Sequence, residues 1–208
     1  ITAARDAILS YISETKNTSI VEGKMIFLQG SPVLDKTGNV LTGRLSGIVA
    51  HHVPSYLTKN RLPSFETNCI EDWELKVDEI VNETVNEKMS LISGIPPWVQ
   101  MYFEKLKKRT GRQIKDVFPH FDLFIYGGVN FEPYRKSFEN LIGKKVDGIE
   151  LYPASEGFIA YQDSQKEVGM LLCVNHGIFY EFIPSHDFFN ENPSRVSLEG
   201  VELGINYV

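Results

Sequence analysis

The residue types best suited to chemistry lie together in residues 152–157, which read Tyr-Pro-Ala-Ser-Glu-Gly. They follow an alternating apolar run at residues 146–151, a pattern typical of a strand that enters a turn. Tyr152 offers a ring face for a base, Ser155 a donor for a phosphate, and Glu156 a ligand for a hard cation such as Mg²⁺. Whether these groups form a site depends on the elements that position them.

A regular alternation of strands and helices leads to this segment. We predict strands at residues 88–93, 122–126 and 146–152, with helices between them at residues 98–110 and 133–142. Proline at the start of the first helix, and Gly111 and Gly143 after the two helices, match the usual start and stop signals. Short connections between alternating strands and helices predict a parallel sheet with right-handed crossovers.

This topology gives the strand ends a functional meaning. In an open parallel sheet, ligands bind beyond the carboxyl ends of the strands. Those ends are expected at residues 94–97, 126–129 and 152–156, so all three turns would line one edge. Gly127 and Gly128 would allow a flat ligand to approach the backbone closely, although turn geometry alone explains the two glycines equally well.

The rest of the chain fits the same architecture. Before the repeats we expect a helix at residues 3–13, a buried strand at 24–28, a small hairpin at 33–41 and an amphipathic helix at 73–85. Asn68 and Glu71 have the spacing of a capping box for the last of these helices. After residue 157 we expect a strand at 158–162 and a hairpin that pairs residues 170–174 with 178–183.

We therefore predict a single α/β domain fragment over residues 1–208. It would contain an open, mostly parallel sheet with flanking helices, three βα repeats at about residues 88–152 and a β-rich, hairpin-containing segment at 157–184. The chain begins at Ile1 without a methionine and stops at Val208 in an apparent strand. We therefore expect it to be an internal piece of a longer protein.

Composition narrows the function classes. A net charge of -6 argues against a sequence-independent grip on nucleic acid or on an anionic membrane surface. No apolar run has the length of a membrane span or the context of a signal peptide, so we expect a cytoplasmic protein. Cys69 and Cys173 are expected as reduced, buried side chains. His51 and His52 have no acidic or thiol ligand at suitable spacing, which disfavours a metal site there.

Four segments together resemble a known family. They are residues 93–98 (Ser-Gly-Ile-Pro-Pro-Trp), 126–135 (Tyr-Gly-Gly-Val-Asn-Phe-Glu-Pro-Tyr-Arg), 152–158 (Tyr-Pro-Ala-Ser-Glu-Gly-Phe) and 177–184 (Gly-Ile-Phe-Tyr-Glu-Phe-Ile-Pro). In this order and spacing they look like the bacterial branch of the auxin-responsive Gretchen Hagen acyl-acid amido synthetases. The resemblance covers most of the chain from about Gly43 onward. That family belongs to the adenylate-forming superfamily.

The resemblance implies a two-step ligase reaction that uses ATP and Mg²⁺, a small carboxylic acid and an amino acid. It implies nucleotide contacts from Gly127, Gly128, Val129, Tyr152, Ala154 and Ser155. It implies an acyl pocket bordered by Gly94, Ile95, Pro96 and Trp98. Ser155 and Glu156 would be the catalytic residues, with Ser155 bonded to the α-phosphate and Glu156 holding the metal. Such groups suit phosphoryl chemistry because a bound metal and a fixed donor stabilise charge that grows on phosphate oxygens.

The chain also departs from the family pattern. Pro153 stands where a small or polar residue is usual and has no N–H to offer a ligand. The Ser/Thr/Gly-rich phosphate loop, the ribose-binding aspartate segment and the small mobile C-terminal domain are absent from this sequence, so we predict that the chain alone does not turn over. Alternatives are an acid:CoA ligase of the same superfamily and a non-catalytic nucleotide-binding or scaffold domain. Tyr152 could also be a core aromatic at a strand end.

Overall fold

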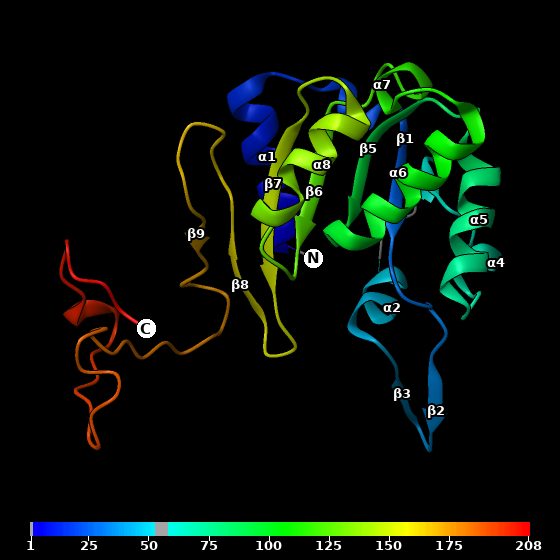
Figure 1. Cartoon of the computed structure of the whole chain (residues 1–208). Coiled ribbons are helices and arrows are strands. Elements are labelled where there is room, and N and C mark those ends of the chain that lie inside the picture. The colour runs from blue at the N-terminus through cyan, green and yellow to red at the C-terminus, as the bar shows by residue number, and fades with distance from the viewer. Residues whose placement is uncertain (1, 53–57) are drawn as a thin grey trace.

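The computed structural model describes residues 2–52 and 58–208. Its centre is a seven-stranded sheet of order β4-β1-β5-β6-β7-β8-β9 (Figure 1). The strands are β1 (Lys24–Leu28), β4 (Arg61–Leu62), β5 (Met89–Gly94), β6 (Leu123–Gly127), β7 (Asp147–Pro153), β8 (Phe158–Tyr161) and β9 (Leu171–Leu172). Neighbours from β4 to β7 are parallel, whereas β8 and β9 are antiparallel to their neighbours. The predicted open, mostly parallel sheet is confirmed.

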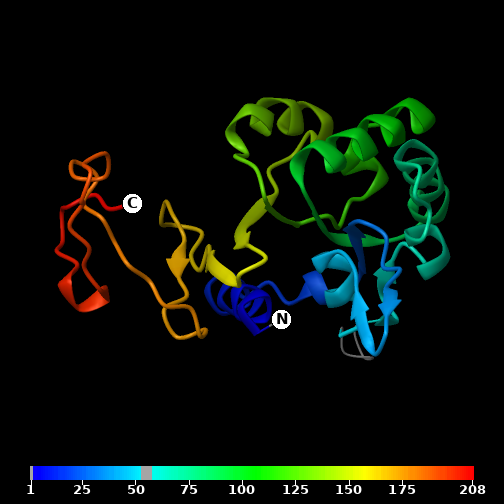
Figure 2. The same ribbon diagram turned by 90° about the horizontal axis from the view of Figure 1, so that it is seen from below.

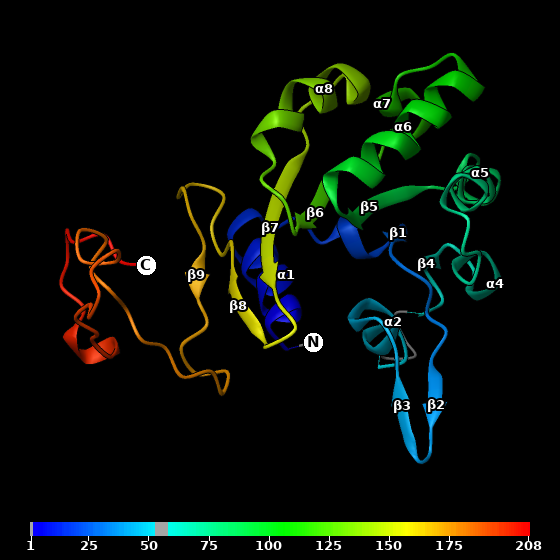
Figure 3. The same cartoon turned by 60° about the horizontal axis from the view of Figure 1, so that its bottom comes forward.

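Helices cover both faces of this sheet. In chain order, the helical elements of the described residues are α1 (Thr2–Thr15), η1 (Ser19–Val21), α2 (Leu45–Ala50), α4 (Phe65–Asn68), α5 (Trp73–Thr84), α6 (Pro96–Thr110), α7 (Ile114–Val117), α8 (Glu132–Ile142) and η2 (Leu198–Gly200), where η1 and η2 are 3₁₀ turns and η2 lies in the C-terminal segment away from the sheet (Figure 1). Helices α5, α6 and α8 pack on one face and α1 on the other (Figures 1 and 3). Successive side chains of a strand point to opposite faces of the sheet. Phe124 of β6 accordingly packs in the core beneath α5, α6 and α8, whereas Leu123 and Ile125 pack in the core beneath α1.

The helix ends in the repeats follow the predicted signals. Helix α6 begins with two prolines and ends at Gly111, which has a left-handed backbone with φ 67°. Helix α8 ends in the same way at Gly143, with φ 78°. Only glycine adopts this conformation at little cost, so these two residues stop the helices where the next strands must begin.

The predicted capping box of α5 is wrong. The N-cap of α5 is Asp72, whose carboxylate accepts a hydrogen bond of 2.9 Å from the Leu75 N–H. Asn68 instead ends the preceding short helix α4, whose own cap is Ser64. The spacing of Asn68 and Glu71 predicted a single helix start, but the chain forms two helices here, α4 and α5. The first was missed because a four-residue helix is too short to show a periodic apolar pattern.

The C-terminal β structure also differs from the prediction. Strand β9 pairs with β8, Ala160 opposite Leu172 and Tyr161 opposite Leu171, and not with residues 178–183. Phe182 instead bridges to Val196, and the chain beyond residue 178 lies beside the sheet (Figures 1 and 2). An alternating pattern identifies an extended segment but not its partner, and the free edge of β8 was available. The other predicted hairpin is present as β2 (Asp35–Thr37) and β3 (Val40–Thr42).

Two further predictions concern the cysteines and the membrane. Cys69 and Cys173 are both free, and Cys173 is buried, which raises the pKa of its thiol. Cys69 is only partly buried. Within residues 2–52 and 58–208, no helix combines the length and apolar character that crossing a membrane requires.

Candidate functional site

The three predicted turns meet at one edge of the sheet. Strands β5, β6 and β7 are parallel neighbours, with Ser93 paired to Ile125 and Gly127 paired to Leu151. Their carboxyl ends therefore lie side by side. The turns after β5 and β6 also touch, since a methyl group on Gly128 would lie 3.3 Å from Cγ2 of Ile95.

Residues 152–157 form the reversal between β7 and β8. Ala154 and Gly157 exchange two backbone hydrogen bonds, of 2.8 and 3.2 Å, which places Ser155 and Glu156 at the two central positions of a tight turn. Both side chains are exposed. Neither makes a hydrogen bond or an ion pair with any other residue that the structure describes, so the hydroxyl and the carboxylate are free to bind a ligand.

Pro153 lies at an irregular point of the same hairpin. The pairing of β7 with β8 shifts its register between Tyr152 and Pro153. Irregular positions in a ladder tolerate a residue that has no N–H, which is why proline is found there. The departure of Pro153 from the family pattern thus has a structural reason.

Tyr152 is not a core residue. Its neighbour Leu151 packs towards α1, and strand alternation puts Tyr152 on the other face of β7, the one that α8 borders. The side chain is 53% exposed. The alternative of a buried strand-end aromatic is therefore wrong, and the ring is available as a surface for a planar group.

The two glycines after β6 are explained by the protein itself. A methyl group on Gly127 would lie 2.1 Å from the carbonyl oxygen of Leu151, so β6 and β7 can pair there only if this residue is glycine. Gly128 has φ 81°, a left-handed conformation that favours glycine. Neither glycine needs a ligand to account for it, although both leave the edge open beside Val129, which is exposed.

The predicted acyl-pocket residues divide into two groups. Gly94 and Ile95 lie at the edge, and Gly94 is where β5 approaches β1, since a methyl group there would be 3.0 Å from Cβ of Leu28. Pro96 and Trp98 belong to α6 instead. Pro96 is buried, and the Trp98 ring lies 4.1 Å from the ring of Trp73 on α5. Trp98 therefore packs α6 against α5.

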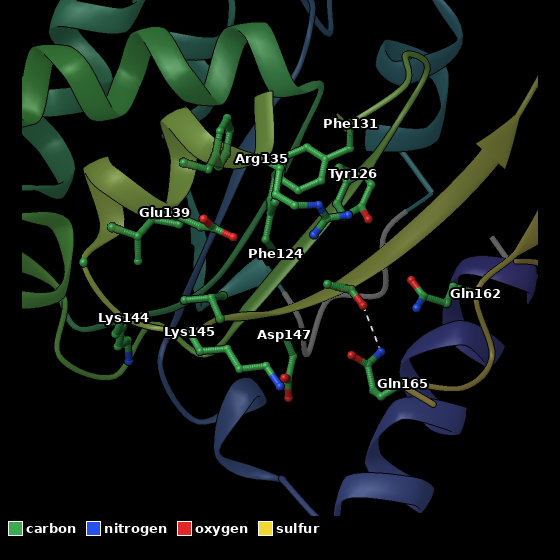
Figure 4. Close-up of a pocket in the computed structure, with 15 residues that line it drawn as sticks. Phe124, Tyr126, Phe131, Arg135, Glu139, Lys144, Lys145, Asp147, Gln162 and Gln165 are labelled. Atoms are coloured by element: carbon green, nitrogen blue, oxygen red, sulfur yellow. Dashed lines mark hydrogen bonds between the residues drawn. The ribbon is translucent and has the colours of Figure 1, made fainter. Parts of the chain in front are cut away.

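A cavity of about 710 Å³ lies next to this edge, between α8 and the face of β7 (Figure 4). It runs from Tyr126 and Phe131 near the carboxyl ends to Lys144 and Lys145 near the start of β7. Gln165 donates a 2.8 Å hydrogen bond to the Gly148 carbonyl at its floor. None of the predicted nucleotide or acyl residues lines this cavity. No sequence pattern indicates this cavity, because its walls come from segments that only the fold brings together.

Two of the cations that line this cavity, Arg135 and Lys144, form ion pairs. Arg135 binds the Glu132 carboxylate, which raises the pKa of the guanidinium and lowers that of the carboxyl group. The same guanidinium lies 5.1 Å from the centre of the Phe131 ring. Burial raises the pKa of Tyr126, and the charge of Glu150 adds to this effect, so its hydroxyl remains a neutral donor.

The chain offers little for a metal on its own. Among the residues that the structure describes, no group of three or more His, Cys, Asp and Glu side chains is arranged to hold an ion. A free carboxylate such as that of Glu156 nevertheless fits Mg²⁺, which proteins commonly hold through one or two carboxylates together with substrate phosphates. The residues present therefore fit a metal that arrives with a nucleotide.

The chain shares its fold with part of a solved structure. Among solved structures, a GH3.15 acyl acid amido synthetase is similar to this chain, with a TM-score of 0.63 and 13% sequence identity. The match covers 98% of this chain and 47% of that one, so this chain spans just under half the length of that structure. At this identity the likeness shows the fold alone. No protein-family model and no curated protein matches the sequence.

Proposed function

We propose that this chain is part of an ATP-dependent acyl-acid amido synthetase of the bacterial branch named above. The observation that carries the proposal is the position of Tyr152, Ser155 and Glu156. All three side chains are exposed where the parallel strands of an adenylate-forming fold end. Ligands of open parallel sheets bind at this edge.

The reaction has two steps. A carboxylate oxygen attacks the α-phosphorus of ATP and pyrophosphate leaves, which gives an acyl adenylate. The amino-acid amine then attacks the acyl carbon, AMP leaves and the amine loses a proton. Both steps concentrate negative charge on phosphate oxygens, where fixed donors and cations lower the barrier.

Each predicted residue has a role consistent with its position. The Tyr152 ring would hold one face of adenine, with the backbone of residues 127–129 on the other side and Ala154 at the end of the slot. Ser155 would donate its hydroxyl to the α-phosphate. Glu156 would hold Mg²⁺, which neutralises phosphate charge when bound. Ile95 and Gly94 would contact the acyl group, and Pro96 and Trp98 would shape that wall from α6.

AMP binding in the presence of Mg²⁺ tests the assignment, measured by ligand-observed NMR. We expect Tyr152→Ala to weaken AMP binding by roughly 5- to 150-fold, because stacking on an aromatic side chain contributes roughly 1 to 3 kcal/mol. We expect Glu156→Ala to abolish the Mg²⁺ dependence of binding. Glu167→Ala removes another exposed carboxylate, beyond β8, and is the matched control. Equal binding by all four proteins would show that the nucleotide does not bind at this edge.

A further inference from the structure

Six cations and no acid lie within residues 105–115, although the whole chain has a net charge of -6. These residues form the last turns of α6 and the start of α7, at the edge of the sheet opposite the candidate site (Figure 1). Lys105 forms an ion pair with Asp78. The other five cations make up a surface that we call the basic patch: Lys107, Lys108, Arg109, Arg112 and Lys115.

Neighbouring residues do not neutralise the basic patch. None of its cations forms an ion pair with a described residue, and four of the five side chains are exposed. Arg109 and Arg112 donate to uncharged oxygens, the side-chain oxygen of Asn82 and the main-chain carbonyl of Asp116. The dipole of α6 favours cations in its last turn. It does not account for Arg112 and Lys115, which lie beyond that turn.

The surface around the basic patch carries no apolar anchor. Helices α6 and α7 lie wholly within the described residues, and neither has an exposed large apolar side chain. A helix that binds a membrane surface inserts such side chains into the bilayer. Single-stranded nucleic acid stacks its bases on aromatic side chains. The basic patch therefore fits a protein surface that supplies carboxylates better than it fits a membrane or a nucleic acid.

The C-terminal segment, residues 178–208, has the opposite charge. It contains no lysine, one arginine and five acids, and four of these acids are exposed: Glu181, Glu191, Glu199 and Glu202. None of them forms an ion pair with a described residue. Apolar side chains lie beside the last two acids, since Leu198 is 49% exposed and Leu203 is fully exposed. The segment thus offers free carboxylates together with apolar surface.

The basic patch and the C-terminal segment lie on opposite sides of one molecule. Strands β7, β8 and β9 stand between α6 and the C-terminal segment (Figures 1 and 3). Two copies that lie side by side and antiparallel would bring each basic patch to the C-terminal segment of the other copy. Such a pair has two identical contacts related by a two-fold axis, so it closes as a dimer and does not grow into a chain.

We propose that the basic patch binds the C-terminal segment of a second copy of this chain. Arg109 and Arg112 suit two-point pairing with carboxylates, and the lysine stems cover the apolar side chains beside the acids. Exposed ion pairs contribute little singly, so we expect a dissociation constant on the order of 10 to 100 µM. The proposal does not rest on the synthetase assignment.

Sedimentation velocity measures this association in the full chain. Between about 5 and 500 µM protein at about 20 mM salt, we expect the monomer to give way to a dimer. Raising the salt to about 300 mM should raise the dissociation constant at least tenfold, because salt screens exposed charges. A monomer at every concentration, a dimer that ignores salt, or assembly beyond a dimer would overturn the proposal.

Charge reversal on each side locates the contact. The patch variant carries Lys107→Glu with Lys108→Glu, and the segment variant carries Glu199→Lys with Glu202→Lys. Each variant alone should dimerise at least tenfold more weakly than the wild type. A mixture of the two should restore the dimer, because one contact then keeps its charges and the other has both sides reversed.

A control variant separates this contact from a general effect of net charge. Lys36→Glu with Lys59→Glu gives the net charge of the patch variant but alters exposed cations outside the basic patch. It should dimerise like the wild type and should bind a fluorescently labelled segment variant at least tenfold more weakly than the patch variant does. If the two variants bind it equally, the proposal fails. It also fails if the wild type stays monomeric and instead binds poly(U) RNA or phosphatidylserine vesicles through the basic patch.

Discussion

Two regions of the molecule differ in how deeply they bury aromatic side chains. One is the sheet body, the described part of residues 2–177, and the other is the C-terminal segment, residues 178–208. In the sheet body, Phe103 is 0% exposed and contacts the rings of Tyr102, Phe121 and Phe138. In the C-terminal segment, Phe189 is 93% exposed. The aromatic content of a segment therefore does not predict whether that segment contributes to a hydrophobic core. A residue is buried where two layers meet, and the C-terminal segment extends away from the layers (Figures 1 and 2).

The two regions are also stabilised differently. The sheet body is held by apolar burial on both faces of a sheet. The C-terminal segment is held by backbone hydrogen bonds, such as the pair between Ile183 and Val208 at 2.8 and 2.9 Å, and by the Asp187 carboxylate, which accepts from the Ser194 N–H. Exposed hydrogen bonds contribute little net stability, so the C-terminal segment should open without unfolding the sheet.

The largest expected contrast comes from one substitution made in both regions. Phe103→Ala should reduce the free energy of unfolding by about 3 to 5 kcal/mol, because it leaves a cavity among packed rings. Phe189→Ala should change it by less than about 0.5 kcal/mol, because the ring is already in water. Urea denaturation of the two variants measures both values. Similar losses would mean that the C-terminal segment belongs to the same cooperative unit.

Glycine replacement should give an intermediate contrast. Gly127→Ala forces a methyl group against the Leu151 carbonyl between two central strands, and we expect a loss of about 3 kcal/mol. Gly204 has φ 86° but no atom within 4 Å of an added methyl group, so Gly204→Ala should cost only about 1 to 2 kcal/mol, through backbone strain alone. Thermal melts of the two variants make the comparison. A larger loss for Gly204→Ala would contradict it.

The smallest expected effect concerns acid. Burial raises the pKa of Glu83, but hydrogen bonds from Ser64 and Thr67 outweigh it, so the folded pKa lies below the ordinary 4.5. A depressed folded pKa contributes stability that is present above pH 4.5 and is lost as the pH falls through the folded value. The urea midpoint of the wild-type protein should therefore fall as the pH drops below about 5, and in Glu83→Gln it should fall less.

The matched variant in the C-terminal segment is Asp187→Asn. The pKa of Asp187 is also lowered, chiefly by the Ser194 N–H, but Asp187 lies in the C-terminal segment, which should open without unfolding the sheet. We expect Asp187→Asn to leave the urea midpoint unchanged at every pH. If Asp187→Asn changed the pH dependence of the urea midpoint and Glu83→Gln did not, the C-terminal segment rather than the sheet body would contribute the acid-sensitive stability.

The repeats from β5 to β7 could be predicted closely because their signals are local. Two prolines start α6, glycines at positions 111 and 143 end the two helices, and the topology of a parallel sheet then brings the turns to one edge. The exposure of Tyr152 could not be predicted, since an aromatic at a strand end fits a core or a surface equally well.

Other features depend on contacts that a linear pattern does not reveal. Lys76 occurs in a charge-rich helix and reads as a surface residue, yet it is buried against Asn68. A second cavity, at Gln29, Arg61 and Asn68, exists because β4 pairs with β1, and β4 is only two residues long. A strand of two residues is too short to show an alternating pattern, so its pairing with β1 could not be predicted from the sequence.

Short strands at both borders have one more consequence. The seven-stranded sheet ends in β4 on one side and β9 on the other, and each contains two residues. A long, flat outer strand is a template on which another chain can aggregate. Here an incoming strand meets only a two-residue ladder at either side, so the sheet is protected against edge-to-edge growth by its own borders.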